Sequence, residues 1–247
     1  MRNLFYCILM MATAQAGELR VLCYNIHHGR GMEGKLDLAR IAEVIRKAKP
    51  DLVALQEVDI HVPRSGNVDT LAQLATSLNM QHAFGKTIDL NGGQYGNAIL
   101  SKFPIMKQTV HKLPGKGETR AILCVDVKVN GKVLSFCSVH FDHQNEQVRL
   151  IQAKAMNIAL EGIKHPVIVA GDLNAIPNSA TMELVRKSWH VVPKQGSPFT
   201  VPADAPKREI DYIVTRNLIR NKAVSRVIEE PVASDHRPVL AIVEIPD

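Results

Sequence analysis

The chain has 247 residues, of which 46% are hydrophobic and 22% charged, and its formal net charge is +6. This length fits one large domain or two small ones, and we expect one because no stretch rich in Gly, Ser or Pro divides the chain. The apolar fraction is typical of a soluble protein with a substantial core. The positive charge favours an anionic partner, although it bears on solubility and steering rather than on fold.

The first sixteen residues have the layout of a secretory signal peptide. Arg2 precedes an apolar run from Leu4 to Ala14, and Ala14-Gln15-Ala16 is a small-x-small cleavage pattern. The run is shorter than the roughly 20 residues that cross a bilayer, and no other segment is long and apolar enough to be transmembrane. We therefore expect cleavage near Ala16, a secreted or periplasmic location and a mature domain over residues 17–247. An apolar N-terminus on a cytoplasmic protein is the alternative.

Strands and helices alternate along the rest of the chain. The apolar pattern predicts strands at Leu19–Asn25, Leu52–Gln56, Asn97–Ser101, Ile105–Lys112, Ile122–Val129, Val133–His140, Val167–Ala170, Ile210–Val214, Lys222–Ile228 and Val239–Ile245. It predicts helices at Leu38–Ala48, Thr70–Leu78, Gln144–Ile163 and Ser179–Arg186. Because helices come early and late, with hairpin-like strands between them, a simple doubly wound parallel sheet is excluded. Two packed mixed sheets with helices outside form the economical α/β arrangement.

For two of the helices the sequence supports more detailed predictions. Asp37 is placed to cap the first helix. The longest helix is expected to turn an apolar side toward the core, made of Val148, Ile151, Ala155, Ile158 and Ala159.

Removal of the signal peptide leaves Cys23, Cys124 and Cys137, which do not have zinc spacing. Asn130-Gly131 is a strong hairpin signal, and with these two as the turn residues Cys124 falls directly opposite Cys137. We expect two reduced, buried thiols on neighbouring strands. In an exported protein a disulfide between them is the alternative.

Acid, amide and imidazole side chains follow several of the expected strands and outline a metal-assisted phosphoesterase site. A phosphodiester is stable because its negative charge repels nucleophiles, and a hard divalent cation held by carboxylate and amide oxygens helps to neutralise that charge. Glu57, alone after an apolar strand, is the best candidate ligand. Asn25 can hold the metal or orient Glu57, and Asp235 can also reach the metal.

The remaining polar residues suit proton transfer and phosphate contact. Asp172 and Asn174 are two apart on one extended segment, so their side chains can point into the same cleft. We expect Asp172 to align or deprotonate water and Asn174 to donate to the attacked phosphate. His140 and His236 can donate to phosphoryl oxygens or move protons near neutral pH. Asp211 is the candidate partner that fixes the tautomer of His236.

The other histidines have no paired spacing, and we expect them on the surface or in loops. His27 and His28 follow Asn25 closely, so a position at the lip of the cleft is the alternative for these two.

In its motifs the chain resembles the endonuclease/exonuclease/phosphatase superfamily. The matching elements occur in order: the strand ending at Asn25, LQEV at Glu57, the strand-end His140, GDLN at Asp172 and Asn174, IDY at Asp211, and SDHRPV at Asp235 and His236. The resemblance covers Leu19 to Ile245. It implies a four-layer α/β/β/α sandwich, dependence on Mg2+ or Mn2+, and hydrolysis of a phosphate ester by direct attack of water.

The chain departs from the pattern at one point. Some nuclease members of the superfamily pair the first catalytic histidine with a Glu after the central strand, whereas this chain has Asn97 there and no acid. Asn97 is therefore a candidate substrate contact. Arg64 and Arg120 are candidate phosphate-binding residues, with solvated surface charge as the alternative.

The substrate is less well defined than the chemistry. A lipid-linked or small phosphodiester is the first hypothesis and a phosphomonoester the second, because the chain is short, has few aromatic residues and has no dense basic stripe. An exported endonuclease acting on DNA or RNA is the alternative, so a nucleic-acid partner stays open. A non-catalytic binding module is a third hypothesis. No oligomerisation signal stands out, and we expect a monomer.

Overall fold

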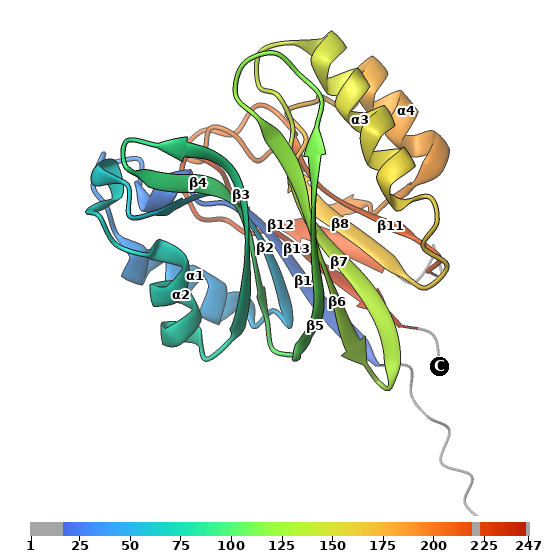
Figure 1. Cartoon of the computed structure of the whole chain (residues 1–247), viewed down its shortest axis with the longest axis horizontal. Coiled ribbons are helices and arrows are strands. Elements are labelled where there is room, and N and C mark those ends of the chain that lie inside the picture. The colour runs from blue at the N-terminus through green and yellow to red at the C-terminus, as the bar shows by residue number, and fades with distance from the viewer. Residues whose placement is uncertain (1–16, 219–222, 246–247) are drawn as a thin grey trace, which may run out of the picture.

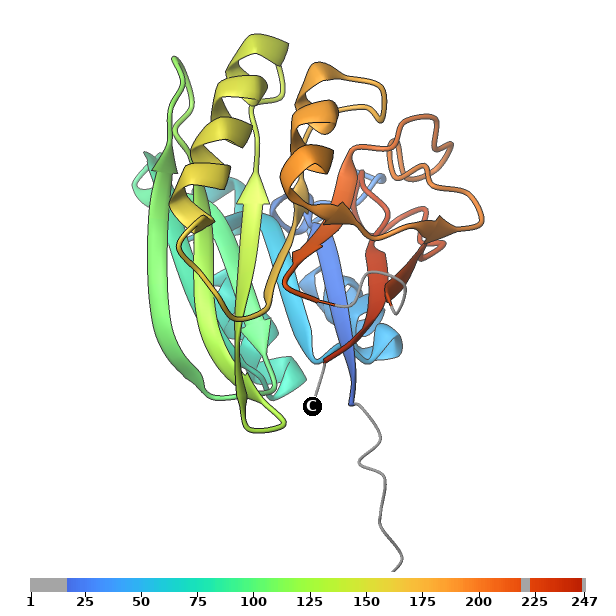
Figure 2. The ribbon, with the colours of Figure 1, turned by 90° about the vertical axis from the view of Figure 1, so that its right-hand side faces the viewer.

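The computed structural model describes residues 17–218 and 223–245. The expected signal peptide and Lys222 lie outside these ranges. Two mixed β-sheets pack face to face, with α1 and α2 outside one sheet and α3 and α4 outside the other (Figure 1). The view turned by 90° in Figure 2 places α3 and α4 side by side over the outer face of their sheet. The predicted four-layer sandwich is therefore confirmed.

One sheet has seven strands in the order β10-β12-β13-β1-β2-β4-β3, and the other has six in the order β5-β6-β7-β8-β11-β9. The strands are β1 (Glu18–Asn25), β2 (Leu52–Ile60), β3 (Gln81–Leu90), β4 (Gly93–Ser101), β5 (Ile105–Leu113), β6 (Arg120–Val129), β7 (Lys132–His140), β8 (Val167–Asp172), β9 (His190–Val191), β10 (Lys194–Gln195), β11 (Asp211–Arg216), β12 (Ala223–Val227) and β13 (Val239–Glu244). The helices are α1 (Leu38–Ala48), α2 (Thr70–Leu78), α3 (Glu146–Leu160) and α4 (Ala180–Ser188).

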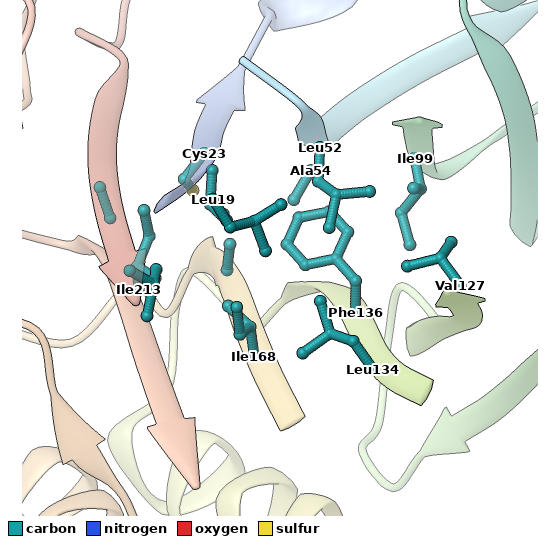
Figure 3. Packing of buried hydrophobic residues seen from close by; sticks show 14 of the residues in the cluster. Leu19, Cys23, Leu52, Ala54, Ile99, Val127, Leu134, Phe136, Ile168 and Ile213 are labelled. Carbon is teal, nitrogen blue, oxygen red and sulfur yellow. The ribbon is translucent and has the colours of Figure 1, made fainter. Parts of the chain in front are cut away.

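Apolar side chains fill the three spaces between the four layers. The middle layer joins the inner faces of the two sheets, where Phe136 packs among residues such as Leu52 and Ile168 (Figure 3). The outer layers bury one face of each helix against its sheet. The sandwich follows because each sheet is apolar on both faces and must be covered on both.

Most of the expected elements are present with small changes at their ends. The carboxylate of Asp37 accepts a hydrogen bond from the backbone N–H of Arg40, so the predicted cap of α1 is confirmed. β3 was not predicted. It lies at the edge of its sheet and carries exposed residues such as Gln81, His82 and Lys86, so its sequence lacks the apolar run of a buried strand.

The buried side of α3 differs from the predicted one. Ile151 is 50% exposed and Ile158 is 73% exposed, whereas Gln152 and Met156 are buried. The prediction is confirmed for Ala155 and Ala159, which pack against the core, and is wrong for Ile151 and Ile158. Burial of Gln152 is stabilised by a hydrogen bond to its side-chain oxygen from the backbone N–H of Asp142, at 2.8 Å.

The β6–β7 hairpin places Cys124 directly opposite Cys137, as predicted from the Asn130-Gly131 turn. The two residues form a disulfide, so the expectation of two reduced thiols was wrong. Cys23 is buried as a free thiol. Within the described residues, no helix has the length and apolar character needed to span a membrane.

Candidate active site

Three of the predicted catalytic residues lie in one row across neighbouring strands. His140 at the end of β7 is paired with Asp172 at the end of β8, and Asp172 is paired with Asp211 at the start of β11. β7 and β8 are parallel and β11 is antiparallel to β8. Their functional residues therefore meet at the same edge of the sheet.

The second sheet brings Asn25 and Glu57 to the same edge. Asn25 at the end of β1 is paired with Gln56 on the parallel strand β2. A β-bulge then separates Leu55 from Val58 in the pairing with β4, and Glu57 inside it has a φ of +59°. A bulge re-aims the side chain of the extra residue, which explains how Glu57 leaves the regular ladder.

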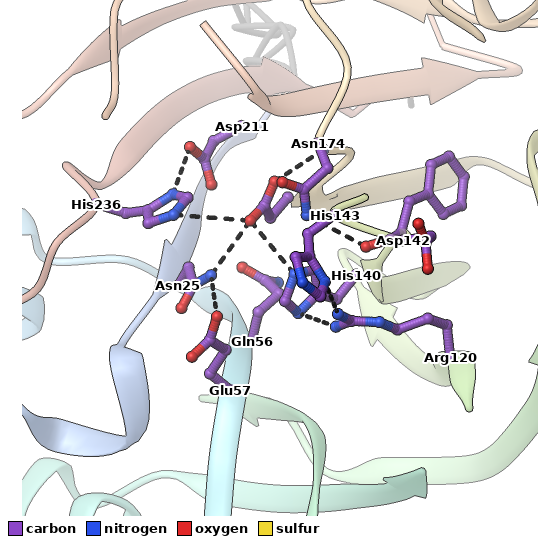
Figure 4. A network of polar contacts seen from close by, with 12 residues as sticks. Asn25, Gln56, Glu57, Arg120, His140, Asp142, His143, Asn174, Asp211 and His236 are labelled. Atoms are coloured by element: carbon purple, nitrogen blue, oxygen red, sulfur yellow. Dashed lines mark hydrogen bonds and ion pairs between the residues drawn. The ribbon is translucent and has the colours of Figure 1, made fainter. Parts of the chain in front are cut away.

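Figure 4 shows Asn25, His140, Asn174 and His236 converging on one point, and the group that all of them contact is the carboxylate of Asp172. Its Oδ2 accepts a hydrogen bond from Asn25 Nδ2 at 3.2 Å. The same oxygen lies 3.4 Å from His140 Nε2 and 3.7 Å from His236 Nε2. Its other oxygen accepts from the backbone N–H of Asn174 at 2.8 Å. Side chains from both sheets therefore fix the orientation of this one carboxylate.

Asp211 and His236 form the predicted pair. His236 Nδ1 donates to Asp211 Oδ2 at 2.9 Å, and Thr200 Oγ1 donates to the same oxygen at 2.5 Å. Burial lowers the pKa of His236, but the charges of Asp211 and then Asp172 outweigh burial and raise this pKa to about 10. His236 is therefore an imidazolium at neutral pH, lying between two carboxylates.

The pKa of Asp172 is raised to about 7, first by burial and then by the negative charge of Asp211. His236 and the hydrogen bonds from Asn174 and Asn25 act in the opposite direction and lower this pKa. An acid that titrates near neutral pH can exchange a proton with water there.

The hydrogen-bond partner of His140 is a cation, whereas the nuclease pattern pairs this histidine with an acid. Arg120 Nη1 donates to His140 Nδ1 at 2.8 Å, and Arg120 Nη2 donates to His143 Nδ1 at 3.2 Å. Burial, followed by the charge of Arg120, lowers the pKa of His140 well below its usual value. Because a guanidinium only donates, His140 Nδ1 is an acceptor and the ring proton resides on Nε2, which faces Asp172.

The other predicted site residues do not take part in the hydrogen bonds around Asp172. Arg64 makes two hydrogen bonds to Asp59, at 2.8 and 2.9 Å, and lies over the ring of Tyr95. Asn97 is buried, and its amide donates to the carbonyl of Ala121 at 2.8 Å; it is not among the residues that line the cavity. Asp235 Oδ1 lies 3.8 Å from His27 Nδ1.

A cavity of about 350 Å³ opens at this edge of the sandwich. One part of its wall is apolar, because Ile88 and Leu90 of the β3–β4 hairpin line it. These two residues were not predicted, because the strand that carries them was missed. Tyr95, Glu118 and His143 also line the cavity and were not predicted as site residues. The remaining lining residues are Glu57, Arg64, Arg120, His140, Asp172, Asn174 and His236.

Comparison with known families covers most of the chain. Residues 22–236 match the model of the Endonuclease/Exonuclease/phosphatase family. The chain belongs to this family. Members of the family are metal-dependent phosphoesterases, and the motif residues around Asp172 and Glu57 lie within the matched range.

Individual members of the family are distant from this chain. The YbhP protein of Escherichia coli is 25% identical over 259 residues, which cover 94% of this chain and 98% of YbhP. Sphingomyelinase C from Streptomyces griseocarneus is 17% identical with a TM-score of 0.73, covering 92% of this chain and 100% of that one. A mannosyl-6-phosphatase of Bacteroides thetaiotaomicron is 18% identical with a TM-score of 0.72, covering 91% and 99%. At these identities the two structures establish the fold alone.

Among the residues that the structure describes, two groups could hold a metal ion. Asp172, Asp211 and His236 are all buried, with ligand atoms within 4.8 Å of one another. His27, His28 and Glu57 form a second group at the same spacing. In the first group His236 is protonated near neutral pH, so that ring has no free lone pair for a cation until the proton leaves. The second group has no such internal ion pair, and its donors fit a divalent cation.

Proposed function

We propose that the protein hydrolyses a phosphodiester, lipid-linked or of a small molecule, by direct attack of an activated water. The observation that carries this proposal is the convergence of Asn25, His140 and His236 on the carboxylate of Asp172. A carboxylate held by several donors, with a pKa raised to about 7, is suited to orient water and accept its proton.

The surrounding side chains have complementary roles in this mechanism. His236, kept protonated by Asp211, donates from Nε2 toward the oxygens around Asp172 and stabilises negative charge that develops on the phosphoryl group. His140 donates from Nε2 and stays neutral, so it binds and orients the phosphate without supplying a second positive charge. Asn174 is held beside Asp172 through its own backbone N–H and contributes a further donor.

Glu57 is the residue that would hold the divalent cation, with Asn25 fixing its orientation. Asn25 Nδ2 lies 3.1 Å from Glu57 Oε1 and 3.2 Å from Asp172 Oδ2, so this amide sets the separation between the two carboxylates. Mg2+ or Mn2+, as the family resemblance implies, would neutralise the phosphate charge and polarise the ester.

The cavity supports a small or amphiphilic substrate. Its volume of about 350 Å³ lies in the range of small-molecule sites, about 300–1,000 Å³. Ile88 and Leu90 offer apolar contact opposite the polar groups. Related folds belong to proteins named as a sphingomyelinase C and a mannosyl-6-phosphatase, so both a diester and a monoester substrate have precedent. We favour the diester because of the apolar wall.

We also propose export, with a signal peptide cleaved near Ala16. The Cys124–Cys137 disulfide supports an oxidising compartment. Recovery of the mature N-terminus from culture fluid or periplasm, followed by N-terminal sequencing, tests this location. A full-length chain found in the cytoplasm would contradict it.

The first experiment compares hydrolysis of bis-(p-nitrophenyl) phosphate and p-nitrophenyl phosphate with Mg2+, Mn2+ or chelator. Metal-dependent turnover should disappear in Glu57→Gln and Asp172→Asn. Asp37→Asn is the matched acid-to-amide control, because an Asn keeps the cap of α1. Unchanged activity in Glu57→Gln would be incompatible with the mechanism.

A second experiment compares natural substrate classes. Phospholipid vesicles, inositol phosphates, plasmid DNA and RNA are offered to the same preparation in competition. We expect turnover of a lipid or small diester. Rapid nicking of DNA without turnover of lipid or small diesters would overturn the substrate assignment in favour of an exported nuclease.

A further inference from the structure

His27, His28 and Glu57 are close enough to share one ion. Each offers a ligand atom, and these atoms all lie within 4.8 Å of one another. The three residues come from two segments that the parallel pairing of β1 with β2 brings together. All three have left-handed backbone conformations, with φ values of 44°, 45° and 59°. Such conformations are uncommon outside glycine and are often found at functional sites.

The two imidazoles differ in their hydrogen bonds. The Nδ1 atom of His27 lies 3.1 Å from the carbonyl oxygen of Arg30, so Nδ1–H donates and the lone pair remains on Nε2. A backbone carbonyl that receives one ring N–H while the other nitrogen faces a metal is the usual support of a metal-binding histidine. The backbone N–H of His27 also donates to Asn25 Oδ1 at 3.1 Å, which fixes the start of this turn.

His28 has the property that points to a missing ligand. The residue is only 6% exposed, and within the described residues its Nδ1 atom is buried without a hydrogen-bond partner. A buried polar atom without a partner is destabilising. An ion bound at Nδ1 would supply the missing partner. The carboxylate of Glu57, fixed by Asn25, supplies the negative charge such a site needs.

We infer that His27, His28 and Glu57 form a site for a borderline transition metal such as Zn2+ or Co2+, in preference to Mg2+. Imidazole nitrogen favours zinc and its neighbours, whereas Mg2+ takes oxygen ligands. Two histidines and a glutamate with a further open position are typical of catalytic zinc sites. The inference shares Glu57 with the proposed function but goes beyond the Mg2+ or Mn2+ that the family resemblance implies.

Metal binding without substrate tests this inference separately from catalysis. Purified protein stripped with chelator is titrated with Zn2+, Co2+ and Mg2+ by calorimetry, and the visible absorption of bound Co2+ reports nitrogen ligands. We expect Zn2+ and Co2+ to bind at least 100-fold more tightly than Mg2+. His27→Asn and His28→Asn should each weaken Zn2+ binding at least tenfold and alter the Co2+ spectrum.

His82→Asn is the matched control, because His82 is exposed on β3 outside this group. Its Zn2+ affinity and Co2+ spectrum should equal those of the wild type. Equal affinity for Mg2+ and Zn2+, or unchanged Zn2+ binding in both histidine variants, would overturn the inference. If the buried His28→Asn protein does not fold, the more exposed His27→Asn decides the question. Tight Zn2+ binding without phosphoesterase activity would support this site and contradict the proposed function.

Discussion

At the scale of single residues, the site depends on two groups with opposite pKa shifts. Asp172 is an acid whose pKa is raised to about 7, and His236 is a base whose pKa is raised to about 10. Between these values Asp172 has lost its proton and His236 has kept its own. The two groups then carry the charges that a base and a phosphate-binding donor require.

The first prediction concerns the pH dependence of this pair. The rate of hydrolysis should rise as Asp172 loses its proton near pH 7 and fall as His236 loses its proton near pH 10. A bound cation shifts the rising limb to lower pH, so the falling limb is the sharper test. In Asp211→Asn the largest charge that raises the pKa of His236 is removed, and the falling limb should move to lower pH. A falling limb unchanged in that variant would contradict the assignment.

Arg120 was expected to contact substrate, and its position behind His140 gives it another role. Its guanidinium requires an acceptor at His140 Nδ1 and so places the ring proton on Nε2. In Arg120→Met this constraint is lost, and the pKa of His140 should rise because a neighbouring positive charge has been removed.

The measurement for Arg120→Met is nitrogen NMR of the His140 ring beside the turnover number. We expect a mixture of tautomers and a loss of roughly tenfold to hundredfold in turnover, below the 10² to 10⁴ typical of an acid–base group itself. Lys207→Met, which removes a cation elsewhere on the chain, is the comparison. A single Nε2–H tautomer retained in Arg120→Met would show that the arginine does not position His140.

At the scale of elements, α3 illustrates what periodicity can and cannot predict. The sequence correctly predicts a long helix in this region and correctly turns Ala155 and Ala159 toward the core. It also predicts burial of Ile151 and Ile158, which are exposed. The choice depends on the fit of Met156 and Leu160 into the layer over β7 and β8 and on the hydrogen bond of Gln152. Neither is visible in the chain itself.

A pair of substitutions on α3 tests this choice. Met156 is fully buried, so Met156→Ala should lower the free energy of unfolding by about 2–5 kcal/mol. Ile158→Ala, on the 73% exposed side chain, should change it by less than about 0.5 kcal/mol. Urea denaturation of both variants measures the difference. Equal losses would mean that both side chains are buried.

The polar residues at the strand ends, in contrast, were predictable from the sequence. Asn25, His140, Asp172 and Asp211 each stand next to an apolar run, and such runs are recognisable without knowing which strands are neighbours. The bulge that turns Glu57 out of the ladder was not predictable. It arises from the pairing of β2 with β4, which are separated along the chain by α2 and β3. The polar edge strand β3 was missed for another reason: it lacks a buried apolar run, although the Asn91-Gly92 turn that joins it to β4 is the same hairpin signal as Asn130-Gly131.

At the scale of the whole molecule, the two sheets are connected by polar as well as apolar contacts. Gln56 Nε2 donates to Ser138 Oγ at 3.0 Å, and Ser138 Oγ donates to the carbonyl of Leu55 at 2.9 Å. These buried bonds join β2 to β7 directly beneath the site. They fix the separation between the part of the site that holds Glu57 and the part that holds His140.

The disulfide of the β6–β7 hairpin should stabilise the folded protein. Cys124 and Cys137 are 13 residues apart and lie in the layer under α3 and α4. Cys124→Ala combined with Cys137→Ala should lower the free energy of unfolding by roughly 2–3 kcal/mol, as for loops of similar length, with activity retained. Urea denaturation with and without reductant measures this loss. Reductant should destabilise the wild type and leave the double variant unchanged, and identical behaviour of the two would contradict the bridge.

The row formed by His140, Asp172 and Asp211 limits which parts of the chain can change without moving the reacting groups. These side chains are located by ladder pairing, so a one-residue slip of β8 would turn Asp172 to the opposite face of its sheet. The loops beyond the row do not carry that constraint, and insertions there leave the ladder intact. The reacting groups are thus encoded in the paired strands, and the loops at the same edge can change in length without moving them.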